Sequence, residues 1–326
     1  MRISILINNF NYKQYVFEAV DSVLNQSVQA DEIIIVDDGS TDGSAQLLRD
    51  KFADHEKIKL HLKDQNEGQL SCFNHGFLAS TGEIICFLDA DDVYHEDYIK
   101  EVLTFYKQHE SCDFLICGYE LFGNKHETIA YYDCDRDLGL SQISTLWGAR
   151  WLGSATSALS VRRHILERFL PLPFLENWRT CADDCLVLSS SIVGARKFYL
   201  AKSLVKYRVH GKNNFYGNRS GGALHEKKGN ALIASFKGKD PNLDNETTLT
   251  EQTKTEFMTI PKPRYQELKL YAGVIKQFEK NPVSKITGIL SLCFYFLRTG
   301  DFFGKVPFKH VRRSKKAPWQ YADESR

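Results

Sequence analysis

The sequence predicts an α/β protein with a mostly parallel sheet that is flanked by helices. In the first 120 residues, short apolar runs alternate with segments of helical periodicity, which is the pattern of βαβ units. The runs are apolar at consecutive positions, as strands buried on both faces should be. Carboxylates follow three of the first four runs. In such sheets ligands bind beyond the carboxyl ends of the strands, so these residues mark the predicted site.

The expected strands and helices of the first half alternate regularly. The strands cover Ile3–Ile7, Glu32–Val36, Ile58–Leu62, Glu83–Leu88 and Phe114–Tyr119. The helices are expected where apolar residues recur every three or four positions. They cover Tyr15–Leu24, Ser44–Phe52, Gln69–Ala79 and Asp97–Gln108.

The second half is less regular. We expect strands and helices over Ala155–Val161, Arg162–Phe169, Asp183–Val193 and Ser203–His210, in the order strand, helix, helix, strand. Residues 213–222 are polar and glycine-rich, which is typical of a loop. The chain then stays charged and aperiodic up to Glu256, which predicts a loop or mobile linker, and becomes helical from Arg264. The expected division is a domain over residues 1–222 and a C-terminal region over residues 223–326.

Composition narrows the class of protein. The chain has 326 residues, a net charge of +1 and 43% hydrophobic residues, which is ordinary for a globular protein and gives no indication of nucleic-acid binding. The eight cysteines form no Cys-x-x-Cys pair, which argues against zinc. Several lie inside apolar runs, so we expect reduced thiols and a cytoplasmic protein. No apolar run is long enough to span a bilayer.

The loops at the strand ends restrict the chemistry. The first loop, Asn8-Asn9-Phe10-Asn11, has no glycine, so neither a dinucleotide-binding loop nor a P-loop fits. Phosphates would then need a divalent cation. Asp89-Ala90-Asp91 predicts a site for Mn²⁺ or Mg²⁺, because alternate side chains of an extended segment point the same way. The alternative is an ordinary acidic turn in which Asp92 caps the next helix.

Several segments together resemble glycosyltransferase family 2, a family of inverting enzymes with the GT-A fold. The resemblance is dense over residues 3–100 and returns near residues 183 and 207. Its motifs are Ile5-Leu6-Ile7-Asn8-Asn9-Phe10-Asn11, Ser22-Val23-Leu24-Asn25-Gln26-Ser27, Ile34-Ile35-Val36-Asp37-Asp38-Gly39-Ser40-Thr41-Asp42, Asn66-Glu67-Gly68-Gln69, Gly82-Glu83-Ile84-Ile85-Cys86-Phe87-Leu88-Asp89-Ala90-Asp91-Asp92, Asp183-Asp184-Cys185-Leu186-Val187-Leu188 and Tyr207-Arg208-Val209-His210.

The resemblance implies a catalytic domain over residues 1–222, with a donor half (1–120) and an acceptor half (121–222). The metal would be held by Asp91 and His210. Phe10 would stack on the base and Asp38 would accept a hydrogen bond from it, although Phe10 is also a plausible core residue. The residues expected to bind the nucleotide sugar, which we expect to be a UDP-sugar, are Asn8, Phe10, Asp38, Asp64, Asp89 and Arg208.

The resemblance also implies a general base and an acceptor site. Asp184 would take the proton of the acceptor hydroxyl, and Asp183 would contact the acceptor or support the structure. The alternative is that both complement the dipole of a helix N-terminus. Trp178 is expected to contact the acceptor, whereas Trp147 is expected in the core. The product would be a polysaccharide or another cell-surface glycan, built on a glycan or lipid-linked acceptor.

Two alternatives remain open from the sequence. One is an inactive nucleotide-sugar-binding module, and another is a membrane-attached assembly subunit. Residues 285–316 combine apolar residues with basic ones and contain a single acid, Asp301, so they predict a helix that lies on the inner face of an anionic membrane. The alternative is a helix that packs on the protein or forms a homo-oligomer contact.

Overall fold

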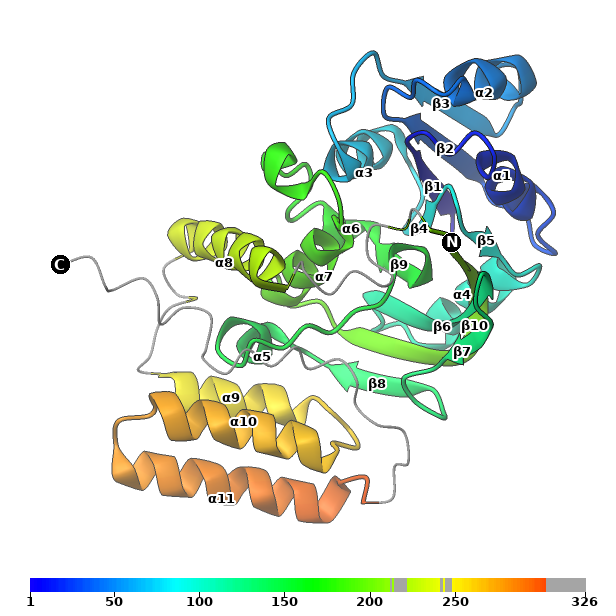
Figure 1. The fold of residues 1–326 in the computed structure, drawn as a ribbon. Coiled ribbons are helices and arrows are strands. Elements are labelled where there is room, and N and C mark those ends of the chain that lie inside the picture. The colour runs from blue at the N-terminus through cyan, green and yellow to red at the C-terminus, as the bar shows by residue number, and fades with distance from the viewer. Residues whose placement is uncertain (212, 214–221, 241–242, 244–247, 303–326) are drawn as a thin grey trace. The chain divides into compact units, whose positions relative to one another are not determined.

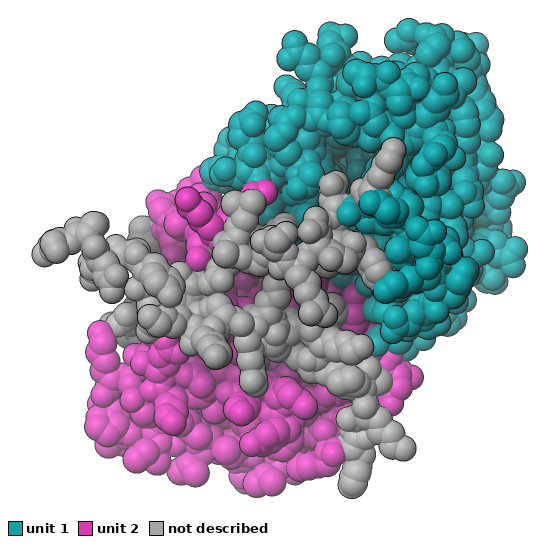
Figure 2. All heavy atoms as spheres, viewed as in Figure 1, with its two compact units in different colours: residues 1–130, 154–186, 200–219 teal, residues 131–153, 187–199, 220–326 magenta. Residues whose placement is uncertain are grey.

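The computed structural model describes residues 1–211, 213, 222–240, 243 and 248–302. The chain divides into two compact units (Figure 2). Unit 1 consists of residues 1–130, 154–186 and 200–219, and unit 2 of residues 131–153, 187–199 and 220–326. The units are interleaved along the chain, and the predicted boundary at residue 222 stays a prediction.

Unit 1 is built on a sheet whose first four strands are parallel. β1 (Ile3–Asn9) lies between β2 (Glu32–Asp37) and β4 (Ile84–Asp89), and β3 (Ile58–Leu62) pairs with the outer side of β2. The sheet continues through strands that include antiparallel pairs, in the order β3-β2-β1-β4-β9-β6-β10-β5. These later strands are β5 (Val93–Tyr94), β6 (Phe114–Gly123), β7 (Glu127–Ile129, paired with β6), β9 (Leu159–Arg162) and β10 (Lys197–Val209).

Helices cover both sides of the parallel strands. Figure 1 shows α3 on one side of β1 and β2 and α1 on the other. The helices of the first half are α1 (Val16–Leu24), α2 (Ser44–Phe52), α3 (Gln69–Ala79) and α4 (Tyr98–Gln108). Shorter elements follow: a 3₁₀ turn at Thr156–Ala158, α6 (Arg163–Leu166), a 3₁₀ turn at Leu175–Trp178, and α7 (Asp183–Ile192), which begins in unit 1 and ends in unit 2.

The order of the strands creates the position for a site. The chain runs outward from β1 through β2 to β3 and then returns to β4 on the other side of β1. Such a reversal opens a crevice at the carboxyl ends of the strands. The register places Asn8 opposite Asp89, and Asn9 opposite Asp37. Polar residues from three strands therefore meet at one edge.

Unit 2 is mainly helical. β8 (Arg136–Gly139) pairs with Lys197–Tyr199 of β10, and α5 (Gln142–Leu146) follows β8. The remaining helices are α8 (Gly222–Lys239), α9 (Leu249–Met258), α10 (Tyr265–Phe278) and α11 (Pro282–Thr299). The last three pack side by side (Figure 1) around a shared cluster of Phe257, Ile260, Tyr271, Ile275, Leu292 and Phe296.

Buried ionic groups hold unit 2 together. The carboxylate of Glu256 in α9 accepts hydrogen bonds from the backbone N–H groups of Ile143 and Ser144, at 2.6 and 2.8 Å, and from the hydroxyl of Tyr271. It therefore satisfies donors at the start of α5, which would otherwise be buried without partners. Arg150 and Glu267, both buried, form an ion pair at 2.7 Å.

The expected elements of the first half are confirmed, and α2, β3 and α3 have the predicted bounds. The second half needs corrections. The predicted strand from Ala155 begins only at Leu159, and the last strand begins earlier, at Lys197. The predicted linker up to Glu256 contains α8 and most of α9. The sequence of α9 lacks a clear apolar periodicity because its buried side includes the polar residues Thr253 and Glu256. Most of the loop predicted at 213–222 lies outside the described residues.

Two further findings concern the whole described chain. None of its helices combines the length and the hydropathy that crossing a membrane would require. All eight cysteines are free thiols.

We expect Gly76→Ala to destabilise unit 1. A Cβ at Gly76 of α3 would lie 2.3 Å from the Cδ1 of Leu6, a buried residue of β1. Overpacking of this kind costs about 1–3 kcal/mol, measurable by thermal denaturation. The control is Gly273→Ala in α10, where the methyl group would meet no described atom within 4 Å and should stabilise the helix by about 0.5–1 kcal/mol. Equal effects of both substitutions would contradict the close packing of α3 on β1.

Candidate active site

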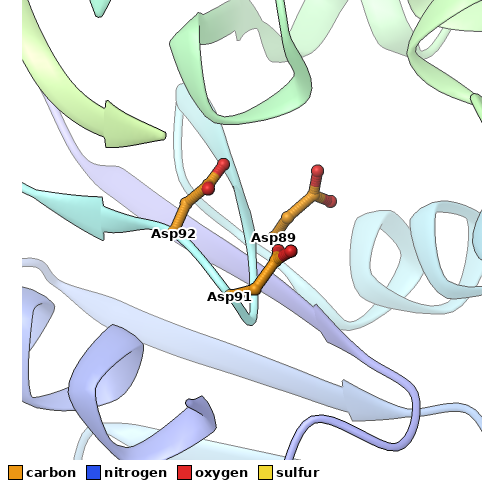
Figure 3. Close-up of side chains that lie close together, drawn as sticks. All are labelled: Asp89, Asp91 and Asp92. Carbon is orange, nitrogen blue, oxygen red and sulfur yellow. The ribbon is translucent and has the colours of Figure 1, made fainter. Parts of the chain in front are cut away.

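Three aspartates gather at the turn after β4 (Figure 3). Asp89 is the last residue of the strand, and the turn is closed by a hydrogen bond from the N–H of Asp92 to the carbonyl of Asp89 at 3.0 Å. One carboxylate oxygen from each of Asp89, Asp91 and Asp92 lies within 4.8 Å of the other two. The predicted pair Asp89 and Asp91 thus comes together, and Asp92 joins it.

Burial and the repulsion of neighbouring carboxylates raise the pKa values of Asp89 and Asp92. Burial raises the pKa of Asp89 to about 7, and the neighbouring charge of Asp91 adds to the shift. The pKa of Asp92 is also well above its usual value, first because of burial and then because of Asp91 and Asp89. Three acidic groups held together in this way are stabilised by a cation. Oxygen ligands of this kind fit Mg²⁺ or Mn²⁺.

Hydrogen bonds with Ser157 and Arg208 hold the aspartate turn in place. The hydroxyl of Ser157 donates to Asp92 at 2.6 Å and accepts from the backbone N–H of Asp89 at 3.1 Å. The other oxygen of Asp92 accepts from the backbone N–H of Arg208 at 2.9 Å. Asp92 does not cap the next helix, because the residue before α4 is Asp97. It anchors the turn to β10 instead.

His210 reaches the aspartates from the residue that follows β10. Its Nε2 lies 2.9 Å from a carboxylate oxygen of Asp91. The imidazole is flanked by the rings of Tyr12 and Tyr15, with centroids at 5.6 and 5.1 Å. The Tyr12 hydroxyl also hydrogen-bonds to Asp91, and burial together with the three carboxylates raises the pKa of Tyr12. The predicted pair of Asp91 and His210 comes together, whereas neither tyrosine was predicted as a site residue. Both tyrosines lie just beyond the first loop.

Arg208 contacts the aspartate turn, a glutamate and two aromatic rings. Its Nε donates to the backbone carbonyl of Asp91 at 2.8 Å, and its guanidinium pairs with Glu18. The guanidinium carbon lies 4.5 Å from the ring centroid of Tyr15 and 4.2 Å from that of Phe122. These contacts stabilise the aspartate turn. A contact of Arg208 with the donor stays a prediction.

The other expected donor residues lie around the end of β1. Asn8 hydrogen-bonds to Asp89, and Phe10 is 41% exposed, so its ring is accessible rather than part of the core. Asp38 is buried and its carboxylate accepts hydrogen bonds from the N–H groups of Glu67 and Gly68, at 3.1 and 2.7 Å, and pairs with Lys63. Asp38 thus shapes the loop before α3, and Asp64 lies exposed on that loop.

Gln69 links the aspartate turn to the predicted general base. At the start of α3, its side-chain amide donates to Asp89 at 3.0 Å and accepts from the N–H of Ala182 at 2.9 Å. Ala182 directly precedes Asp183 and Asp184, the first two residues of α7. Gln69 belongs to one of the family motifs, but no role was predicted for it. Its position could have indicated a role, because Gln69 is the first residue of a helix that follows a strand end.

The acidic pair lies in the first turn of α7. Asp184 is 5% exposed and Asp183 is partly buried. The dipole of a helix favours carboxylates at its N-terminus, which is the alternative interpretation of this pair. Trp178 is 1% exposed, so its indole is part of the core and is not presented to an acceptor in this structure. Trp147 is buried, as expected, and packs against Phe278.

Comparison with known proteins identifies the family of the chain. The family described as "Glycosyl transferase family 2" matches residues 4–167. An uncharacterised glycosyltransferase of Nostoc sp. is 34% identical over 241 residues, which cover 72% of this chain and 72% of that protein. The protein therefore belongs to glycosyl transferase family 2 and is a glycosyltransferase.

Solved structures show the fold. S. aureus TarS in complex with UDP-GlcNAc aligns over 92% of this chain and 74% of its own, with a TM-score of 0.55 and 14% identity. The mannosyltransferase PcManGT from Pyrobaculum calidifontis, in complex with GDP-Man and Mn²⁺, aligns over 91% and 83%, with a TM-score of 0.52 and 16% identity. The expected GT-A fold with a C-terminal helical region is confirmed.

We expect Asp89→Asn to raise the melting temperature in the presence of EDTA, and to do so more at pH 8 than at pH 5. The pKa of Asp89 is raised to about 7 in the folded protein, above the ordinary value of about 3.9, so the folded state loses stability as the pH rises between these values. The uncharged amide of the Asp89→Asn variant does not ionise, so this loss of stability at higher pH is removed. Asp54→Asn, at an exposed aspartate, is the control. A change that is independent of pH would contradict the raised pKa.

Proposed function

We propose that the protein is an inverting glycosyltransferase that moves a sugar from a nucleotide diphosphate, most simply UDP, to an acceptor hydroxyl. The observation that carries the proposal is the aspartate cluster at the strand edge and its link through Gln69 to the acidic start of α7. The aspartate cluster suits a diphosphate with its cation. The acidic residues at the start of α7 suit an acceptor hydroxyl that must lose a proton.

Mn²⁺ or Mg²⁺ would be held by Asp91, with Asp89 and His210 beside it. The ion would neutralise the diphosphate as it leaves. In support, a structural neighbour was solved with GDP-Man and Mn²⁺ and another with UDP-GlcNAc. Phe10, the exposed aromatic residue of the first loop, would stack on a base beside Asn8. Asp38, which follows β2, and Asp64, on the loop before α3, would border the same base.

The chain's own residues would perform the transfer as a single displacement. The acceptor oxygen attacks the anomeric carbon on the face opposite the diphosphate, the bond from that carbon to the diphosphate oxygen breaks, and the acceptor proton passes to a carboxylate. We assign that carboxylate to Asp184, with Asp183 as a contact to the acceptor or to the structure. The anomeric configuration is inverted in such a step.

The acceptor class and the place of action are also proposals. We propose a glycan or lipid-linked acceptor in the synthesis of a cell-surface polysaccharide, with the enzyme bound peripherally to the cytoplasmic face of a membrane. A lipid-linked acceptor would make attachment to that surface useful. An inactive nucleotide-sugar-binding subunit is the alternative, and hydrolysis of common sugar nucleotides in the presence of Mn²⁺ separates the two.

Asp91→Ala should abolish transfer and the metal-dependent part of nucleotide binding while the fold is retained. The reason is that Asp91 is the aspartate that contacts His210 and Tyr12. Binding of UDP with and without Mn²⁺, measured by calorimetry, checks this. Asp54→Ala is the matched control at an exposed aspartate. Full activity of the wild-type protein in excess EDTA would refute the metal site.

Asp184→Asn should still bind the donor but should lose transfer by about 10²–10⁴-fold, the usual contribution of a general base. The donor residues belong to other elements, so donor affinity should stay near that of the wild type. Asp183→Asn is the matched comparison and should cost less. Near-normal turnover of Asp184→Asn would show that another group is the base. Retention of configuration in the product, read by NMR, would exclude the single displacement.

A further inference from the structure

Helix α11 has apolar residues on two opposite faces. One face, with Leu292 and Phe296, is buried against α9 and α10. The other carries an apolar stripe, here called the outer stripe, whose members are 60–69% exposed. Its residues, at spacings of three or four positions, are Val283, Ile286, Leu290, Phe294 and Leu297. These spacings place all five on one side of the helix.

A water-facing helix normally presents polar side chains, so the outer stripe needs an explanation. Single exposed apolar residues are ordinary, but a continuous apolar row marks a surface that contacts something apolar. Figure 1 shows α11 at the edge of the three-helix group formed with α9 and α10. The helix is well defined at its start, where Asn281 accepts hydrogen bonds from the N–H groups of Val283 and Ser284.

Charge indicates the kind of partner. Residues 280–300 contain Lys280, Lys285 and Arg298 but no aspartate or glutamate. Glu279 precedes this stretch, and Asp301 follows it and pairs with Arg136 and Arg264. The sequence over 302–322 adds six lysines and arginines and no acid. The guanidinium of Arg298 lies 5.7 Å from the ring centroid of Phe294, so a cation borders the outer stripe itself. An apolar row with cationic surroundings matches the boundary between acyl chains and anionic headgroups.

A second copy of the chain fits these features less well. Two such helices face to face would bring the basic residues of one copy close to those of the other. A stable protein interface also uses about 20–30 residues on each side, far more than one row supplies. We propose that the outer stripe of α11 binds the surface of an anionic membrane, with the helix lying parallel to it. This inference rests on the peripheral location proposed above and specifies the surface that makes the contact.

The structure also determines how the inference should be tested. Truncation before α11 would remove Leu292 and Phe296 from the shared cluster, so loss of binding could reflect unfolding. Substitutions on the outer stripe avoid this problem, because its side chains are exposed. We choose Leu290→Asp combined with Phe294→Asp. Leu78→Asp is the matched control, since Leu78 in α3 is a leucine of unit 1 that is 67% exposed.

The experiment uses the full chain and two kinds of vesicle, one of phosphatidylcholine alone and one of equal parts phosphatidylcholine and phosphatidylglycerol. The wild type and Leu78→Asp should sediment with the mixed vesicles. The double variant should partition at least about tenfold less, because charged groups replace two apolar side chains that enter the interface. Its melting temperature and donor hydrolysis should match those of the wild type.

A second readout covers the case in which the double variant fails to fold. Phe294→Trp should gain a blue-shifted emission component on mixed vesicles, whereas Leu78→Trp should not. Equal binding by a folded double variant would overturn the inference while leaving the peripheral location standing. No binding by the wild type would overturn both, and donor hydrolysis would still test the transferase separately. A wild-type dimer that the double variant dissociates, without vesicle binding, would assign the outer stripe to a second copy.

Discussion

The mutual repulsion of three aspartates at the end of β4 is the constraint around which unit 1 is arranged. One carboxylate oxygen from each of Asp89, Asp91 and Asp92 lies within 4.8 Å of the other two, although burial and like charge disfavour the ionised forms of Asp89 and Asp92. A turn with such a cost persists only when its surroundings over-determine it. Hydrogen bonds from Ser157 and from the backbone of Arg208 provide that support.

The supporting groups come from distant parts of the chain. Ser157 lies in a 3₁₀ turn before β9, Arg208 and His210 come from the end of β10, and Gln69 comes from the start of α3. Each contacts the aspartate turn through a directional hydrogen bond, so the turn has one arrangement rather than several. The same contacts connect the cluster to α7, where the acidic pair begins.

Unit 2 is stabilised by an apolar cluster together with buried hydrogen bonds to a carboxylate. Its helices α9, α10 and α11 bury an apolar cluster, and the buried carboxylate of Glu256 accepts hydrogen bonds from donors that the short helix α5 leaves unpaired. Polar residues on the buried side of α9 are part of this arrangement. Helix α11 contributes one apolar face to the cluster and keeps a second apolar face exposed. The same helix can therefore be a structural element and a contact surface.

The sequence alone determined the parallel half of the sheet, since strands and helices there alternate with clear periodicity and α2, β3 and α3 have their predicted bounds. It also identified Asp89 and Asp91, because residues at strand ends meet at one edge by topology. Only the tertiary structure revealed the contacts of Ser157, Tyr12 and Gln69 with the aspartates, since these residues are far apart in the chain. It likewise showed that Trp178 is buried and that the aperiodic segment before Glu256 contains α8 and the start of α9. Burial there depends on long-range packing and on polar side chains whose partners the sequence does not specify.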